Sequence, residues 1–147
     1  MAILVQRMID SEISFIIHSV NPITDDPSQV YIELAIGQGE TLASANQSGT
    51  PYRLTFDKKT GKVQVVAFAS YSYGLFANQL SRGLAKRCVD YSQIPFHKNP
   101  ADLMSLGAHL GEVACLIEKR FGGEPQDIEG CIDGANETYI VQSRNQV

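Results

Sequence analysis

The sequence predicts an α+β fold in which a mostly antiparallel sheet is packed by one long helix and closed by a β-hairpin. Three features predict it: short segments rich in β-branched and aromatic residues, a long amphipathic segment after them, and an alternating pattern over residues 126–147. The chain has 147 residues, of which 44% are hydrophobic and 19% are charged, as in an ordinary domain with a buried core. We therefore expect residues 1–147 to form a single domain.

The strand candidates all precede the amphipathic segment. They are residues 3–8, 14–19, 30–36, 52–56 and 63–69, each bounded by turn-forming residues. The last two are typical of a hairpin, because the loop between them carries Gly61 near its end. Residues 70–98 are weakly patterned and rich in small and polar residues, so we expect a mobile or inserted segment there.

The helix has clear signals at both ends. Asn99 is a good N-cap, Pro100 suits the first helical position, and Gly122 with Gly123 ends the last turn. Apolar residues recur at three- and four-residue intervals on one side: Leu103, Leu106, Leu110, Val113, Ala114, Ile117 and Phe121. This stripe predicts that the helix lies against the sheet.

Residues 126–147 predict two strands joined by a loop of two or four residues near Gly134. Because side chains alternate between faces, Asp127 and Glu129 point the same way, and either loop places Gln142 and Arg144 beside them. The same alternation puts Thr138 and Ile140 on this polar face, and Ile128, Gly130, Ile132, Tyr139 and Val141 on the apolar reverse.

This polar face has the groups of a metal–phosphate site. Asp127 and Glu129, one alternation apart, can hold a Mg²⁺ ion that carries nucleotide phosphates. A nearby guanidinium, that of Arg144, can neutralise phosphate oxygens. On the pattern alone, an amphipathic hairpin whose polar face meets solvent is the more frequent explanation.

Other motifs are less specific. Gly37 and Gly39 follow a strand and would let backbone N–H groups approach a phosphate, although most such turns bind nothing, and no Walker sequence is present. His18 lies in a strand candidate and His109 lies opposite the apolar stripe, where structural or surface roles are the more frequent. No serine is set in a nucleophile turn, so the sequence gives no support for hydrolase chemistry.

Composition excludes several classes of partner. The net charge of −4 lacks the basic footprint of a nucleic-acid-binding protein, and no apolar run is long enough to span a bilayer. The cysteines, Cys88, Cys115 and Cys131, are odd in number and contain no Cys-x-x-Cys pair, which argues against a disulfide framework or a zinc site. We expect a soluble protein of a reducing compartment, with neither a nucleic-acid nor a membrane partner.

Taken in order, several motifs resemble the ATP-grasp nucleotide-binding domain of dikinases. They are Val5-Gln6-Arg7-Met8; Ser14-Phe15-Ile16-Ile17-His18-Ser19-Val20-Asn21-Pro22; Glu33 with Gly37-Gln38-Gly39-Glu40; and Asp127-Ile128-Glu129 with Val141-Gln142-Ser143-Arg144. The family includes pyruvate phosphate dikinase, phosphoenolpyruvate synthase and the α-glucan, water dikinases, and residues 14–19 are most similar to the glucan group. Asn145, where the family usually has Pro, and Gln38, where it usually has Leu, are mild departures.

The resemblance implies the C-terminal lobe of an ATP-grasp domain, with ATP and Mg²⁺ as cofactors. Asp127 and Glu129 would bind the metal, and Glu129 and Arg144 would act in phosphoryl transfer. The nucleotide-binding residues would be Gln6, Arg7, Met8, Glu33, Gly37, Gly39, Glu40 and Gln142. Gln6, Arg7 and Met8 would meet the adenine edge through the backbone.

The resemblance also implies missing parts. The other ATP-grasp lobe and the phosphohistidine domain would precede residue 1, and the intact enzyme, in the cytoplasm or a plastid, would phosphorylate an α-glucan. No histidine here lies in a carrier motif, so we expect the isolated chain to be inactive. A phosphoenolpyruvate-forming dikinase is the alternative acceptor class, and a noncatalytic nucleotide-binding or structural module is the alternative of a different kind.

Overall fold

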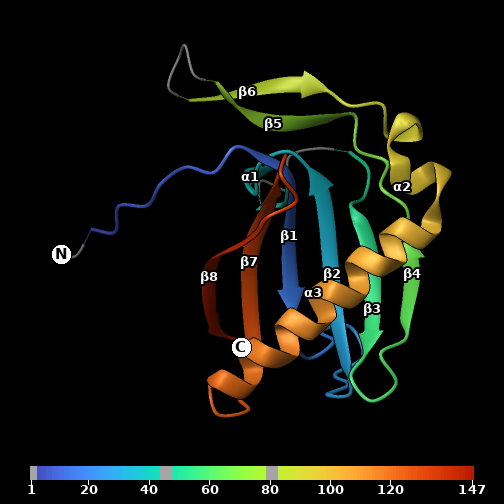
Figure 1. Ribbon diagram of the computed structural model, residues 1–147, viewed down its shortest axis with the longest axis vertical. Helices are drawn as coiled ribbons and strands as arrows, with labels where there is room; N and C mark the ends of the chain where they lie inside the picture. Colours follow the sequence, from blue (N-terminus) through green and yellow to red (C-terminus); the bar gives the residue numbers. More distant parts are fainter. Residues whose placement is uncertain (1–2, 44–47, 79–82) are drawn as a thin grey trace.

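Two antiparallel sheets and one long helix make up the computed structural model, which describes residues 3–43, 48–78 and 83–147 (Figure 1). The larger sheet has six strands in the order β4-β3-β2-β1-β7-β8, and the smaller one pairs β5 with β6. The strands are β1 Ser11–His18, β2 Gln29–Ile36, β3 Tyr52–Asp57, β4 Val63–Ala67, β5 Tyr73–Asn78, β6 Gly83–Cys88, β7 Gln126–Asp133 and β8 Thr138–Asn145. The helices are α1 Glu40–Ala43, the 3₁₀ helix η1 Tyr91–Gln93, α2 Pro95–Lys98 and α3 Pro100–Arg120. The predicted α+β class is confirmed.

Helix α3 crosses one face of the six-stranded sheet obliquely (Figure 1). It begins where the sequence predicts, since the Asn99 side chain accepts a hydrogen bond from the Ala101 N–H. Its buried residues include Leu103, Leu110 and Ala114 of the predicted stripe, whereas Phe121 at the end of the stripe is exposed. None of the described helices is long and apolar enough to cross a membrane.

Two glycines of α3 face the sheet and allow the helix to approach it closely. A Cβ atom built on Gly111 would lie 2.2 Å from the Phe56 ring, and one on Gly107 would lie 2.9 Å from Leu54. The core between helix and sheet is formed by alternate strand residues: Phe15, Ile17, Val30, Ile32, Leu34, Leu54, Phe56 and Ile128. Since strand side chains alternate, the intervening residues point to the opposite side, which we call the open face.

One prediction about secondary structure is wrong, and another stays a prediction. Residues 3–8 form no strand, because they pair with no neighbouring strand, and Ile3, Leu4 and Val5 are 79%, 80% and 88% exposed. The segment 70–98, expected to be mobile or inserted, contains β5, β6, η1 and α2, and its residues 79–82 lie outside the described part of the chain. Its strands are short and only partly buried, so the hydrophobic alternation that marks a strand is weak there.

Candidate polar site on the open face of the sheet

Cross-strand pairing gathers polar side chains in two rows on the open face. One row runs Arg144, Asp127, His18, Tyr31 and Thr55, and the next runs Gln142, Glu129, Ile16, Glu33 and Arg53. Each row is a set of directly opposed residues, whose side chains lie close enough to interact. The alternation therefore brought Asp127, Glu129, Gln142 and Arg144 together as the sequence predicts.

The two strands of the closing hairpin, β7 and β8, are joined by four residues, and a β-bulge interrupts their pairing. Glu129 pairs with Gln142, but Gly130 pairs with Ile140, so Val141 is an extra residue. Between the bulge and the turn, the side chains of β8 lie on the faces opposite to those that the sequence predicts. Thr138 and Ile140 were predicted on the polar face and Tyr139 on the apolar one, and these three predictions are wrong.

Contacts beyond the bulge agree with the reversed faces. The Tyr139 hydroxyl donates to Asp133 on the open face at 3.2 Å. Thr138 Oγ1 instead lies 3.1 Å from His109 Nε2 of α3, so His109, although exposed, has a partner across the hairpin. The Val141 carbonyl accepts from the Gln6 side chain at 3.3 Å, which joins the N-terminal segment to the bulge.

An ion pair dominates the first row. Arg144 donates to Asp127 Oδ2 from Nε at 2.9 Å and from Nη2 at 2.7 Å. These hydrogen bonds raise the pKa of the Arg144 guanidinium above its ordinary value. The Arg144 side chain is 64% exposed and that of Asp127 only 12%, so the carboxylate is fixed in the sheet while the guanidinium faces solvent.

The second oxygen of Asp127 is free to accept a further group. Asp127 Oδ1 lies 3.8 Å from His18 Nδ1, which is too long for a hydrogen bond. Within the described part of the chain, both atoms are buried and have no hydrogen-bond partner. Buried polar atoms of this kind are rare and mark places where a bound water, ion or ligand completes the structure.

Glu33 and Arg53 form a second ion pair, two strands away from β7. Arg53 Nε donates to Glu33 Oε1 at 2.9 Å, which raises the pKa of Arg53, and the Tyr31 hydroxyl lies 3.4 Å from the same oxygen. Ile16 separates Glu33 from Glu129 within the row. Glu33 is therefore already neutralised by its neighbour, and a role in binding nucleotide stays a prediction.

The carboxylates of the open face fit a Mg²⁺ ion that is bound together with a nucleotide. Among the described residues, no group of three or more His, Cys, Asp or Glu side chains could hold a metal alone. Mg²⁺ in nucleotide sites uses one or two carboxylates and takes its other ligands from phosphate and water. Asp127 Oδ1 and the half-buried Glu129 supply that number of carboxylates.

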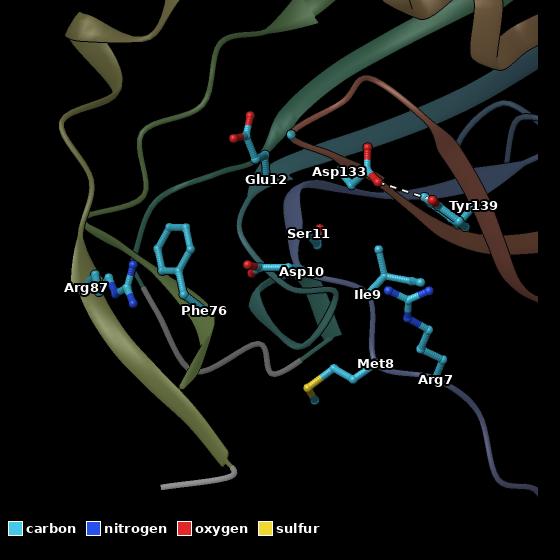
Figure 2. Close-up of a pocket in the computed structure, with 11 residues that line it drawn as sticks. Arg7, Met8, Ile9, Asp10, Ser11, Glu12, Phe76, Arg87, Asp133 and Tyr139 are labelled. Carbon is cyan, nitrogen blue, oxygen red and sulfur yellow. Dashed lines mark hydrogen bonds between the residues drawn. The ribbon is translucent and has the colours of Figure 1, made fainter. Parts of the chain in front are cut away.

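A cavity of about 620 Å³ lies at the other end of β7, beside the turn of the hairpin (Figure 2). Its walls come from three parts of the chain: Arg7, Met8, Ile9, Asp10, Ser11 and Glu12; Asp133, Gly134 and Tyr139; and Phe76 with Arg87 of β5 and β6. This volume is typical of a small-molecule site. Asp133 and Glu129 share the open face of β7 four residues apart, which is about 13 Å at the usual strand rise.

The glycine turn after β2 supports this cavity. Gly37 has φ +97°, its N–H donates to the Glu12 carbonyl at 2.8 Å, and its carbonyl accepts from Ser11 Oγ at 2.9 Å. The N–H of Gln38 donates to the Leu75 carbonyl at 2.6 Å. The backbone of the turn is thus engaged within the protein at these positions, whereas Gly39 and Glu40 are exposed at the start of α1.

Sequence reasoning missed His18 on the open face and most of the residues that line the cavity, of which only Arg7 and Met8 were predicted. For His18 a structural or surface role was the more frequent expectation, because nothing in the sequence shows that β1 pairs with β7 and sets His18 opposite Asp127. Phe76 and Arg87 lie in the segment expected to be unpatterned. The alternation of strand residues places His18 on the same face as Ser14, and this is the one local signal of its position.

Comparison with known proteins shows the family of the chain. Residues 1–147 match the family model described as the AMP/ATP-binding domain of pyruvate phosphate dikinase. The whole chain is 30% identical to α-glucan water dikinase 2 of Arabidopsis thaliana and to the chloroplastic α-glucan water dikinase of Solanum tuberosum, of which it covers 13% and 12%. It is 27% identical to a probable phosphoenolpyruvate synthase of Pyrococcus horikoshii, over 95% of the chain and 17% of that protein. The chain therefore spans less than a fifth of the length of each of these relatives.

Proposed function

We propose, since the chain belongs to the AMP/ATP-binding domain family of pyruvate phosphate dikinase, that it is the ATP- and Mg²⁺-binding C-terminal lobe of an ATP-grasp dikinase. The observation that carries this proposal is the pairing of Asp127 with Arg144 and of Glu129 with Gln142 on the face that α3 leaves open. A second lobe outside this sequence would cover that face.

Different side chains of the two rows would bind the metal and the phosphates. Asp127 and Glu129 would hold the metal, and Gln142 would donate to a phosphate oxygen. Arg144, whose guanidinium faces solvent, would turn from Asp127 to the phosphates as they bind. Bound Mg²⁺ would supply charge neutralisation at the transferring phosphoryl group, which is the main requirement of such reactions.

The charges of this face explain why the nucleotide would need the metal. The sum of the formal charges is −1 for Asp127, Glu129 and Arg144 together, and a net negative charge repels a polyphosphate. With Mg²⁺ the local sum is +1, which attracts one. We expect the base to lie toward Arg7 and Met8 in the cavity of Figure 2, with the phosphates toward Asp127.

For the acceptor we propose an α-glucan, phosphorylated through a histidine carried by another domain. The similarity to two α-glucan water dikinases supports this acceptor. The similarity to a probable phosphoenolpyruvate synthase supports the second candidate, a pyruvate-directed dikinase. Phosphate transfer from β-labelled ATP to glucan or to pyruvate by the complete enzyme distinguishes the two.

Calorimetric titration with Mg-ATP tests the proposed site, using the chain extended upstream by the preceding lobe. We expect Asp127→Asn and Glu129→Gln each to weaken binding at least about tenfold, the cost of a charged hydrogen-bond or metal ligand. Glu137→Gln is the matched control, because Glu137 is an exposed carboxylate of the same hairpin. For the isolated chain we expect weak binding and no AMP formation. Parental binding and turnover by both site variants would refute the metal site.

A further inference from the structure

We propose that His18 is a nitrogen ligand of the divalent cation that binds at Asp127, and that it gives this site a preference for transition metals such as Mn²⁺ over Mg²⁺. The inference rests on the proposed function, which assigns a cation to Asp127, and adds to it one ligand and a metal selectivity. The observation behind it is the separation of 3.8 Å between His18 Nδ1 and Asp127 Oδ1, two buried atoms that lack a hydrogen-bond partner among the described residues.

The sheet holds both residues in register, so the separation belongs to the fold. His18 pairs directly with Asp127, and β1 lies between β2 and β7 in the middle of the sheet. Next to this pair, the Ser19 N–H donates to the Gln126 carbonyl at 2.9 Å, and the Gln126 N–H donates to Ser19 Oγ at 2.8 Å. The strands therefore cannot slide to close the distance without breaking these hydrogen bonds.

Contacts on their other sides restrain both side chains. Asp127 is only 9% exposed, and Arg144 donates two hydrogen bonds to its other oxygen. The His18 ring lies beside the buried Tyr31, with the ring centroids 6.4 Å apart. A buried carboxylate oxygen and a buried ring nitrogen that face each other without contact cost free energy unless a third group binds both of them.

The length of the separation decides which group fits. A direct hydrogen bond would need about 2.9 Å between the two atoms. A bridging water, with hydrogen bonds of about 2.8 Å and a near-tetrahedral angle, would hold the two atoms about 4.5 Å apart. Two ligand atoms that each lie about 2.1 Å from one cation are about 3.0–4.2 Å apart. The observed 3.8 Å falls within that interval.

A cavity of about 320 Å³ gives an ion and its remaining ligands access to the pair. It lies between His18, Asp127 and Arg144 on one side and residues 145–147 on the other. The Gln146 side chain fixes this C-terminal wall, because it accepts from the Val20 N–H at 3.2 Å and donates to the Val20 carbonyl at 2.9 Å. Water or phosphate oxygens in the cavity would complete the coordination of the ion.

A nitrogen ligand changes which metals the site prefers. Mg²⁺ takes oxygen ligands, whereas the first-row transition metals also accept an imidazole nitrogen. His18 would bind through the lone pair of Nδ1, in the tautomer whose proton is on Nε2. Asp127 and Glu129 alone would present only oxygen ligands, which suit Mg²⁺.

Electron spin-echo spectroscopy of Mn²⁺ tests this assignment, because it detects a nitrogen nucleus that is bound directly to the metal. We would load the 147-residue chain with Mn²⁺, alone and with ATP, and compare unlabelled with ¹⁵N-histidine-labelled protein. We expect a nitrogen modulation in the parent that changes with the label. His18→Asn replaces the ligand nitrogen by an amide, and His18→Phe keeps a ring without nitrogen, so both variants should lose the modulation.

Metal titrations measure the selectivity. The ratio of the Mn²⁺ affinity to the Mg²⁺ affinity should fall at least about tenfold in His18→Asn, since an amide offers oxygen in place of nitrogen. His109→Asn is the matched control, because His109 is an exposed histidine of α3, on the opposite face of the sheet, whose Nε2 lies 3.1 Å from Thr138. This variant should keep both the nitrogen modulation and the parental ratio.

The outcomes separate this inference from the proposed function. Binding of Mn²⁺ without nitrogen modulation, modulation that persists in both His18 variants, or an unchanged affinity ratio in His18→Asn would each overturn the role of His18. So would a failure of the chain to bind Mn²⁺, since both ligands lie within it. If Asp127→Asn still weakened Mg-ATP binding by the extended chain in those cases, the proposed function would stand. If His18 bound Mn²⁺ while Asp127→Asn and Glu129→Gln left Mg-ATP binding unchanged, the proposed nucleotide site would fail instead.

Discussion

Arg144 gives both of its hydrogen bonds to the same oxygen of Asp127, which leaves the other oxygen, on the His18 side, without a partner among the described residues. The guanidinium proposed for the phosphates is therefore paired with the carboxylate proposed for the metal. Because Arg144 is largely exposed and Asp127 is not, the arginine is the member of the pair that is free to change partner. The pair holds the carboxylate in place before the nucleotide arrives.

Replacing Arg144 should weaken ligand binding and also lower the stability of the fold. We expect Arg144→Gln to weaken Mg-ATP binding about tenfold or more, because a charge-assisted hydrogen bond to phosphate is lost. The Asp127 side chain is only 12% exposed, so the loss of its partner should also lower the free energy of unfolding, by about 1–3 kcal/mol. Calorimetry and urea unfolding measure the two effects.

Arg144→Lys is a second variant that separates the charge of the side chain from its ability to bind two oxygens. It keeps the charge but loses the fork that binds two oxygens, so its affinity should lie between those of the parent and Arg144→Gln. Equal Mg-ATP affinity in all three proteins would contradict a role for Arg144 at the phosphates.

Removal of divalent cations should abolish most of the binding of ATP while sparing adenosine. The open face carries a local charge of −1 at Asp127, Glu129 and Arg144, and only a cation reverses its sign. Mn²⁺ in place of Mg²⁺ should broaden the amide resonances of β7 near Glu129 and of β1 near His18, since it is paramagnetic. ATP binding that is equal with and without a chelator would contradict this prediction.

The parts of the fold that local signals specify were predictable. The cap at Asn99, the glycines after the helix and the apolar spacing located α3, and simple alternation placed Asp127 and Glu129 together. The faces of Thr138, Tyr139 and Ile140 were not predictable, because a single bulge at Val141 reverses them and nothing in the local sequence marks that bulge.

Long-range pairing accounts for the rest of what sequence missed. His18 faces Asp127 only because β1 inserts between β2 and β7, an order that no local pattern specifies. Residues 3–8 have the composition of a strand but no strand beside them, which shows that β-propensity depends on a partner. Gly107 and Gly111 lower the helix propensity of α3, and they lie where the helix contacts the sheet.

The hairpin turn should contribute stability that depends on pH through Asp133. Hydrogen bonds from the Glu137 and Ala135 N–H groups and from the Tyr139 hydroxyl hold the pKa of Asp133 below its ordinary value. A lowered pKa means that the folded state favours the carboxylate, so the stabilisation is complete above the unfolded-state pKa of about 4 and is lost as the pH falls through the lower folded-state pKa.

Asp133→Asn tests this sign. The variant should have a lower Tm than the parent at pH 7, and the difference should shrink as the pH is lowered below about 4. Thermal unfolding followed by circular dichroism across that range gives the comparison. A difference in Tm that grew on acidification would contradict the assigned direction of the pKa shift.

Gly111→Ala should destabilise the protein even though alanine is the better helix former. Alanine gains about 1 kcal/mol over glycine in a helix interior. Its methyl group, however, would lie 2.2 Å from the Phe56 ring in the core, so α3 or the ring must move. Overpacking of this kind costs about 1–3 kcal/mol, so after the gain in helix propensity we expect a net loss of up to about 2 kcal/mol by urea unfolding. Ser105→Ala on the exposed side of the same helix is the control and should be neutral or slightly stabilising. If Gly111→Ala were as stable as Ser105→Ala, the close approach of α3 to the sheet at Phe56 would be wrong.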